Sequence, residues 1–354
     1  QSKRLYGLIT AGDKFTTLIA GLLVPSLLPI IGTENLLFLS IVTMISAFFN
    51  QSQILKAGSI QEEEEEEKRA EQAAVSAGLS EDEESTYKRY MKLVLALQAA
   101  ISALYFSIDN AFLTEVHSNF LTAEALASFL SYTSAATALG SIILGAISAR
   151  TIVERFGTIS MLQITPIVVV VLAILGASTA ALLPATIWIL AILTVMRVAE
   201  RCLTPTVFNP SFHSLFHPLP KELGSKAHNY SITIAGPLAG AGVGLLLLAL
   251  KSITTPTTAL FCTLIFVSGI TMIVICRQTG LLYPKVLTFA VGSRRMHNIE
   301  LGLNDKHSLQ LLEAGLSSQR AEEVIYSLDL LLKLRPERLR PLYPELLQHP
   351  QSLV

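Results

Sequence analysis

The stretch "TPIVVVVLAILGASTAALLPATIWILAILTVM", residues 165–196, contains no charged residue. A membrane-spanning helix needs about 20 consecutive, mostly apolar residues, so this stretch is long enough for most of two spans, divided near Pro184. The whole chain has the same character: of its 354 residues 51% are hydrophobic and only 15% are charged, and its mean hydropathy is +0.54. A soluble domain carries about 25% charged residues. The composition therefore predicts an all-α, polytopic integral membrane protein.

Working outward from residues 165–196, the same criterion predicts about eight spans. They lie near residues 6–30, 34–55, 90–113, 125–149, 158–181, 184–206, 227–250 and 256–277. A glutamate-rich segment separates the second span from the third, and such charge blocks are usually solvated. The predicted domains are two helices in 1–56, an acidic cytoplasmic linker in 57–89, six helices in 90–285 and a soluble region in 286–354. The chain starts without methionine, which suggests a fragment of a longer protein.

The distribution of lysine and arginine predicts which loops face the cytoplasm, because cytoplasmic loops carry an excess of these residues. If the N-terminus is cytoplasmic and the spans alternate, nearly all basic loop residues fall on the inner side. Lys251 is then the only lysine or arginine in the predicted outer loops. This pattern predicts that both ends of the chain lie in the cytoplasm. A bacterial inner membrane is the expected location.

Residues 286–354 differ from the spans, because their apolar residues recur at helical spacing between polar ones. Leu309, Leu312 and Leu316 form one such set, and Leu328 and Leu331 belong to a second. This periodicity predicts short amphipathic helices. One helix pair cannot bury its apolar faces alone, so we expect these helices to begin a stacked array that can bind a cytosolic protein partner.

Several functional classes are disfavoured by composition and by motif. The net charge of −1 gives no indication of nucleic-acid binding. The three cysteines lie in or beside apolar segments and form no metal or disulfide pattern. His213 and His217 are four residues apart, but no glutamate of a zinc-peptidase motif lies between them and Pro218 follows directly. Hydrolase motifs are also missing from the sequence. We therefore expect no enzyme, no cofactor and no metal.

Ionisable residues inside predicted spans are the candidate functional residues, since they usually face a cavity or a partner. Asp13 and Lys14 lie near the middle of the first span and should point to different sides of the helix. In one interpretation at least one of them faces a functional cavity. In the other they neutralise each other, or a charge on another helix, and only fix the packing. Asp109, late in the third span, either binds a solute amine or a proton, or lies at a helix end already in contact with water. Glu115, nearer the exit, is either functional or a surface residue.

Arg197, Glu200 and Arg201 follow the charge-free stretch directly, at the predicted cytoplasmic end of the sixth span. Spacings of three and four residues place them on one helix face. One interpretation is an interfacial anchor with an intrahelical ion pair, whose long basic side chains reach the headgroups. The other is an inner gate or an anion-binding wall, with Arg201 as the free positive charge. We expect Thr204-Pro205 to end this helix and Pro210 and Pro218 to prevent its continuation.

Two further sets of residues have predicted structural roles. Gly236, Gly240 and Gly244 are four apart in "GPLAGAGVG", so they share one face and allow close helix packing. They do not form a phosphate loop, because no Gly-Lys-Ser/Thr follows. The short inner loop "ARTIVERFG" carries charges that either lock the inward side of a transporter or anchor the loop by the positive-inside rule. These residues are Arg150, Glu154 and Arg155.

Four further motifs follow one another along the chain: "KRLYGLITAG", "LTEVHSNF", "RTIVERFGTISMLQITPIVVV" and "RCLTPTVFNPSFHSLFHPLPKELGSKAH". Their order resembles that of the nucleotide (ATP/ADP) translocase branch of the major facilitator superfamily. Two spans, a charged loop and six spans are similar to the end of the first half and the whole second half of a twelve-span facilitator. The C-terminal helices resemble HEAT repeats, which some bacterial relatives of these carriers have behind the transporter. Over most of the chain, the resemblance implies a partial facilitator fold.

The chain departs from the family pattern at several charged positions. Asn209 stands where the family has the aspartate of Phe-Asp-Pro, and Thr204 stands where it has a lysine. In the Lys-x-Lys turn Lys226 is kept, and His228 takes the second place. These changes remove positive charge that suits a polyanionic nucleotide.

Two functions follow from this pattern. The first is a facilitator-type secondary transporter, which moves a small polar or anionic solute, nucleotides included, by rocking two bundles about a midplane site. Its candidate binding or gating residues are Asp13, Lys14, Asp109, Glu115, Arg197, Glu200, Arg201 and Lys226. The alternative is a membrane-anchored scaffold or signalling protein whose HEAT-like helices bind a cytosolic partner. The sequence leaves the solute, the coupling ion and the direction open.

Overall fold

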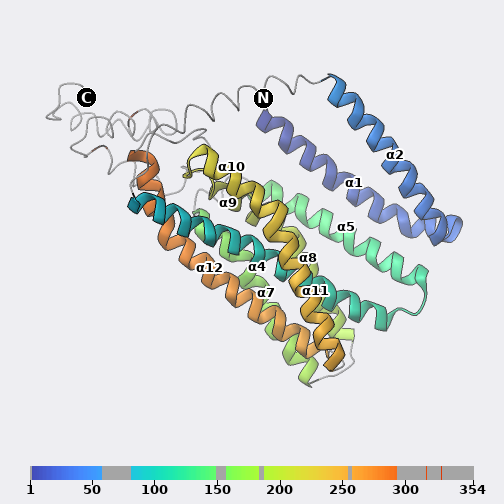
Figure 1. The fold of residues 1–354 in the computed structure, drawn as a ribbon. Coiled ribbons are helices and arrows are strands. Elements are labelled where there is room, and N and C mark those ends of the chain that lie inside the picture. Colours follow the sequence, from blue (N-terminus) through green and yellow to red (C-terminus); the bar gives the residue numbers. More distant parts are fainter. Residues whose placement is uncertain are drawn as a thin grey trace. The chain divides into compact units, whose positions relative to one another are not determined.

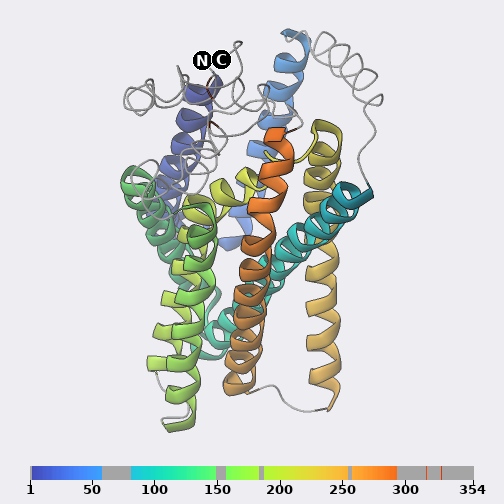
Figure 2. The ribbon, with the colours of Figure 1, turned by 90° about the vertical axis from the view of Figure 1, so that its left-hand side faces the viewer.

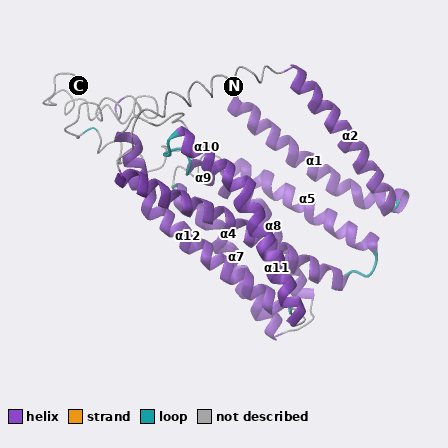
Figure 3. Ribbon diagram, in the orientation of Figure 1, coloured by secondary structure: helices purple, strands orange, loops and turns teal. Residues whose placement is uncertain are grey.

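A computed structural model describes residues 2–57, 81–148, 157–182, 187–253 and 257–292, together with Leu316 and Leu328. Over these residues the chain is helical apart from short turns, and they contain no strand (Figure 3). The expectation of an all-α chain is therefore confirmed for the described residues. The chain divides into two compact units, one of residues 1–80 and 113–142 and the other of residues 81–112 and 143–354.

The first unit contains α1 (Ser2–Ile31), α2 (Thr33–Ala57), the last turns of α4 (Glu81–Asn119) and most of α5 (Ala123–Ser148). Gly32 joins α1 to α2 with a φ of 79°, a left-handed conformation that glycine adopts without strain. Gly21 lets α1 approach α5 closely, because a Cβ atom there would lie 2.8 Å from the carbonyl oxygen of Ser131. Ala135 lies equally close to this position, with its backbone nitrogen 2.9 Å away.

The second unit contains the candidate site and is built around α4, α7 (Thr158–Leu182), α8 (Ile187–Leu203) and α12 (Thr258–Gly292). Helices α7 and α12 lie side by side (Figures 1 and 2). Glycines allow this approach: a Cβ atom at Gly269 would lie 2.5 Å from Cγ2 of Val170, and one at Gly280 would lie 2.7 Å from Cγ2 of Ile159. Small residues at helix contacts are typical of membrane helix packing.

After α8 the chain continues without a break through η1 (Thr204–Phe208), a π-helical segment, into α9 (Asn209–Ser214). The expectation that Thr204-Pro205 ends the helix is therefore wrong. A proline is tolerated in the first turn of a helical segment, where its missing N–H would have no intrahelical partner. Pro205 and Pro210 occupy such first-turn positions in η1 and α9. Because the wider π turn starts a new segment, both prolines fit inside a continuous helix.

The same construction recurs in the next helix. Helix α10 (Lys221–Tyr230) passes through the π-helical segment η2 (Ser231–Ala235) into α11 (Gly236–Ile253). A turn at 215–220 joins α9 to α10, and the hydroxyl of Tyr90 in α4 donates a hydrogen bond of 2.9 Å to the carbonyl of Leu215 in that turn. This buried bond ties the turn to α4.

Six helices of the described part are long and apolar enough to cross a membrane. They comprise Gly12–Ile31, Glu84–Asn119, Ala123–Ala146, Thr158–Leu182, Leu223–Ile253 and Thr258–Ala290. The chain thus has the helices of an integral membrane protein. The expected eight spans are not confirmed, because two predicted spans fall short. The apolar part of α2 is Glu34–Asn50, and α8 has 17 residues, of which the last seven include the three charges.

The helix boundaries also differ from those expected. Helix α4 begins at Glu81, inside the predicted linker, where acidic residues in a first turn stabilise the positive end of the helix dipole. Helix α12 continues to Gly292, past the predicted end of the membrane region. Residues 58–80 of the linker, and the helical array predicted after residue 292 apart from Leu316 and Leu328, lie outside the described residues.

Candidate functional site

One carboxylate of α4 binds two arginines of α8. The Nε atom of Arg197 donates to Oδ1 of Asp109 at 2.8 Å, and a terminal nitrogen of Arg201 donates to the same oxygen at 2.9 Å. The two arginines are four residues apart, so they lie one above the other on the face of α8 that meets α4. Their side chains are only 15% and 32% exposed, and that of Asp109 is 23% exposed. The three charges are thus largely removed from solvent.

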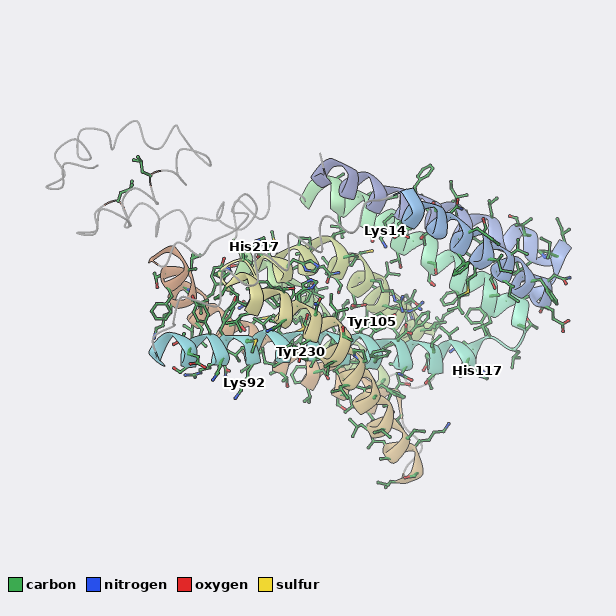
Figure 4. The ribbon with its side chains drawn as sticks, turned by 45° about the horizontal axis from the view of Figure 1, so that its top comes forward. Lys14, Lys92, Tyr105, His117, His217 and Tyr230 are labelled. Atoms are coloured by element: carbon green, nitrogen blue, oxygen red, sulfur yellow. The ribbon has the colours of Figure 1, made fainter. Side chains whose placement is uncertain are left out.

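Aromatic rings of α4 hold both guanidinium groups in place. The guanidinium carbon of Arg197 lies 4.3 Å from the ring centroid of Phe112, and that of Arg201 lies 4.6 Å from the ring centroid of Tyr105. The same terminal nitrogen of Arg201 also donates to the hydroxyl of Tyr105 at 2.6 Å. Such cation–π contacts are worth about 0.5–2 kcal/mol each, depending on desolvation. Figure 4 labels Tyr105 on α4. Together these contacts fix each guanidinium against α4.

Glu200 lies on α8 between the two arginines in sequence, and its side chain is buried, with 2% of the residue exposed. Its Oε1 accepts a hydrogen bond of 2.9 Å from the hydroxyl of Thr204, at the start of η1. Neither guanidinium is bonded to it in the described structure, since both are directed to Asp109. The intrahelical pair expected from spacing is therefore not formed. A carboxyl group buried in this way depends on Thr204 for its polar contact.

The two interpretations offered for these charges both need correction. Arg197 and Arg201 both bind Asp109 of α4 and are mostly buried, so the intrahelical ion pair of the first interpretation is not formed. Arg201 is not a free positive charge either, because Asp109 and Tyr105 bind it. Two guanidinium groups share the one carboxylate of Asp109, so these three side chains carry one more positive than negative charge. Such an arrangement can exchange the carboxylate for another anion, or hold two helices together.

The candidate residues of the first unit lie apart from this cluster in the chain and form local contacts. Asp13 and Lys14 do not point to different sides: Nζ of Lys14 lies 3.1 Å from Oδ2 of Asp13. This is the mutual neutralisation that was one alternative, and the Asp13 side chain is 64% exposed. Glu115 is half-buried and its Oε1 accepts a hydrogen bond of 3.3 Å from Asn119. These contacts give no sign of a cavity site.

The remaining predicted residues divide into three groups. Gly236 and Gly240 lie against α4, because a Cβ atom at Gly236 would lie 3.3 Å from Oγ of Ser102 and one at Gly240 would overlap the ring of Phe106, whereas Gly244 has nothing within 4 Å. Lys226 is exposed on α10. The inner-loop residues lie outside the described residues; they are Arg150, Glu154 and Arg155.

A histidine pair joins α9 to α10, but its members are not the two histidines that lie four residues apart in the sequence. Nε2 of His228 lies 3.1 Å from Nδ1 of His213, and the two ring centroids are 5.1 Å apart. His217, four residues after His213, is not part of this hydrogen bond; Figure 4 labels it in the turn after α9. The partner on α10 is 15 residues away from His213, so periodicity within one helix could not indicate it.

Sequence reasoning missed Tyr105, Phe112 and Thr204 as parts of the arginine cluster. A signal existed for the first, because Tyr105 precedes Asp109 by four residues and must share its helix face. Thr204 follows Glu200 by four residues and carries the same signal. Phe112 follows Asp109 by three residues, so the same rule places it on that helix face.

Comparison of the chain with protein-family models, with curated proteins and with solved structures gave no match. The resemblance to nucleotide translocases and to HEAT repeats therefore stays a prediction from the motifs.

Proposed function

We propose that this protein is a secondary transporter of the facilitator type, which moves a small anionic solute across a membrane by alternating access. The observation that carries the proposal is the sharing of Asp109 by Arg197 and Arg201 between two helices of a largely apolar chain. Ionisable groups within membrane helices are costly, at roughly 2.5–3.5 kcal/mol on insertion scales, and they commonly mark solute or ion pathways.

The depth of the cluster along its helices supports this proposal. Asp109 lies ten residues before the last residue of α4, and Arg197 lies ten residues after the first residue of α8. At 1.5 Å per residue each is about 15 Å from its helix end. If these two ends face the same side of the membrane, as the basic loop residues predict, the cluster is near the middle of a ~30 Å core. Transporter sites typically lie at this depth.

The charge of the cluster favours an anion over a cation as the solute. Guanidinium groups bind carboxylates and phosphates with two parallel hydrogen bonds, and they remain charged at all physiological pH values. In the observed state Asp109 occupies both arginines through one oxygen. A solute carboxylate or phosphate would compete with Asp109 for them, which couples solute binding to the contact between α4 and α8. The motif resemblance makes nucleotides the first solutes to test.

The proposal includes the finer topology. Helices α2 and α8–η1–α9 would also cross the bilayer, which makes eight spans, with both ends of the chain on the cytoplasmic side of a bacterial inner membrane. The region after residue 292 would then lie in the cytoplasm, where it can bind a protein partner.

Uptake into proteoliposomes tests the proposal directly. The purified chain is reconstituted and supplied with radiolabelled ADP, ATP and inorganic phosphate, with uncharged adenosine as the comparison. We expect uptake of at least one anion and none of adenosine. Asp109→Asn and Arg201→Gln should each reduce that uptake at least tenfold. The matched control is Arg277→Gln, which removes an exposed arginine of α12 and should leave uptake unchanged.

Two results would contradict the proposal. One is a folded protein that moves none of these anions, nor amino acids, at any imposed ion gradient. The other is uptake that is reduced equally by Arg277→Gln and Arg201→Gln. The first result, together with capture of a cytosolic protein that depends on residues 293–354, would favour the membrane-anchored scaffold instead.

A further inference from the structure

A pair of imidazole nitrogens on neighbouring helices faces one another outside the arginine cluster. Nδ1 of His213, on α9, and Nε2 of His228, on α10, are 3.1 Å apart. Two nitrogens of a tetrahedral zinc site, each at about 2.0–2.1 Å from the metal, are separated by roughly 3.3 Å. The two side chains therefore have nearly the separation that a shared metal ion requires.

Aromatic neighbours hold the two rings in this arrangement. The ring of Phe216 lies edge-on to His228 with a centroid distance of 5.2 Å, and the ring of Phe212 lies 6.2 Å from that of His213. Phe212 is buried and contacts Phe216 in turn, at 5.2 Å. The histidine orientations are thus set by packing, which is what a preformed ligand pair needs.

The pair lies close to the turn at 215–220 that joins α9 to α10. His213 is exposed and His228 is half-buried, so the remaining ligands would be waters that reach this end of the two helices. A metal ligand must be the neutral imidazole. In the observed hydrogen bond one of the two facing nitrogens donates and the other accepts, so a metal ion bound between them takes the place of the shared proton.

We propose that His213 and His228 form a binding site for a divalent transition-metal ion, Zn²⁺ or Cu²⁺, which joins α9 to α10 in place of their shared hydrogen bond. Imidazole nitrogen suits both ions, and Cu²⁺ should bind more tightly than Zn²⁺. The described residues contain no group of three or more His, Cys, Asp or Glu that could hold a metal. The site is therefore a two-nitrogen site completed by water. It does not depend on the transport function proposed above.

The chain supplies a matched control in His217, which lies in the turn directly after α9. Its ring is half-buried, and it takes no part in the hydrogen bond between the pair. Replacing it changes the histidine content of the same segment without removing a proposed ligand. Any metal binding that follows histidine number alone would change equally in all three variants.

The test is metal binding by the purified chain in detergent, with any affinity tag removed. Isothermal titration with ZnCl₂ should give one site in the wild type and in His217→Gln. His213→Gln and His228→Gln should each weaken that site at least tenfold. Thermal unfolding should show a rise in Tm with Zn²⁺ for the first two proteins and not for the others, because a ligand that binds only the folded state stabilises it. Electron paramagnetic resonance of the wild type with one equivalent of Cu²⁺ should show coupling to two nitrogens.

The Cu²⁺ spectrum needs no variant, so it tests the site even if a substitution disturbs folding. A spectrum with one nitrogen ligand or none overturns the proposal. It is also overturned if Zn²⁺ binds His213→Gln as tightly as the wild type, or if Zn²⁺ leaves the Tm of the wild type unchanged. In the last case the pair is a structural hydrogen bond only, and both ligand variants should lower Tm without any metal effect.

Discussion

Thr204 shows how one side chain can satisfy a buried ionisable group. Its hydroxyl donates to Oε1 of Glu200, which is buried, while the two neighbouring arginines of α8 are directed to Asp109. Thr204→Val keeps the shape of the side chain and removes the donor, so a buried oxygen loses its partner. We expect the free energy of unfolding to fall by about 1–3 kcal/mol.

The measurement for Thr204 is unfolding of the purified protein in mixed detergent micelles at constant pH. Thr204→Ser keeps the hydroxyl and serves as the control, with an expected loss of less than about 1 kcal/mol. Equal losses in the two variants would show that packing of the methyl group, and not the hydrogen bond, stabilises this position.

His217 predicts a pH dependence of stability. Burial lowers the pKa of its half-buried imidazole below the ordinary value of 6.5. Below that value the unfolded chain binds more protons at this residue than the folded chain does. The free energy of unfolding should therefore fall as pH is lowered through 6.5 toward the folded pKa, by at most about 1.4 kcal/mol per pH unit. His217→Gln should flatten the profile of Tm between about pH 7.5 and pH 5. An unchanged slope in this variant would contradict the prediction.

Much of the candidate site could be predicted residue by residue, but its pairing could not. Asp109, Arg197, Glu200 and Arg201 stand out because they are ionisable residues among apolar ones. Asp109 and Arg197 are 88 residues apart in the chain, so no spacing rule connects them. Spacing within α8 favoured a pair with Glu200 instead, and the carboxylate of α4 overrode that local preference.

At the scale of elements, the contact of α1 with α5 depends on the absence of a side chain at Gly21. A Cβ atom there would meet backbone atoms of Ser131 and Ala135 at 2.8–2.9 Å, and backbone cannot rotate away as a side chain can. Gly21→Ala should therefore force the two helices apart and destabilise the protein by about 1–3 kcal/mol.

The control for this contact lies in the same helix. Gly12 has nothing within 4 Å of its Cβ position, so Gly12→Ala should be neutral or should stabilise the protein by up to about 1 kcal/mol through helix propensity. Thermal unfolding of both variants in detergent gives the comparison. A Gly21→Ala protein as stable as Gly12→Ala would show that the helices separate in solution.

Most helices could be located from the sequence because runs of apolar residues are long and uninterrupted. Every described α-helix except α9 overlaps a predicted span. The error concerned the effect of proline on a helix. Proline was expected to end α8, but the π-helical segments let α8 and α10 continue. A rule about a single residue type could not anticipate this, because a π turn inside a helix gives a proline a first-turn position that the rule does not consider.

At the scale of the whole molecule, the orientation in the membrane can be tested on one continuous helical stretch. Ser225, in α10, and Lys251, in α11, are both exposed and 26 residues apart (251 − 225 = 26). At 1.5 Å per residue the distance is about 39 Å, which exceeds a ~30 Å hydrocarbon core. We expect Lys251→Cys to react with an impermeant maleimide added outside intact cells. Ser225→Cys should react only after the membrane is opened.

The native cysteines should not interfere with this labelling. Cys202, Cys262 and Cys276 are buried, so the wild type should show little reaction on either side. Labelling of Ser225→Cys from outside would reverse the predicted orientation, and labelling of both variants from one side would show that the stretch does not cross.

The class of the molecule could be predicted from composition, whereas the number of spans could not. Length and hydropathy identify helices such as Thr158–Leu182 without ambiguity. Helix α8 is harder to assign, because its charged final turns lower its hydropathy although they are paired with α4 in the folded chain. Composition measures a residue alone, and pairing changes what its burial costs.

The π-helical segment η1 has a consequence for everything that follows it. A π turn holds about one residue more than an α turn, and one residue corresponds to about 100° of rotation around a helix axis. If Thr204–Phe208 were wound as an ordinary α-helix with the same number of residues, α9 would be rotated by about that angle and His213 would be carried away from His228. Because the π turn absorbs one residue, deleting a single residue from this segment should leave an α turn, keep α9 near its present angle and preserve the histidine pair.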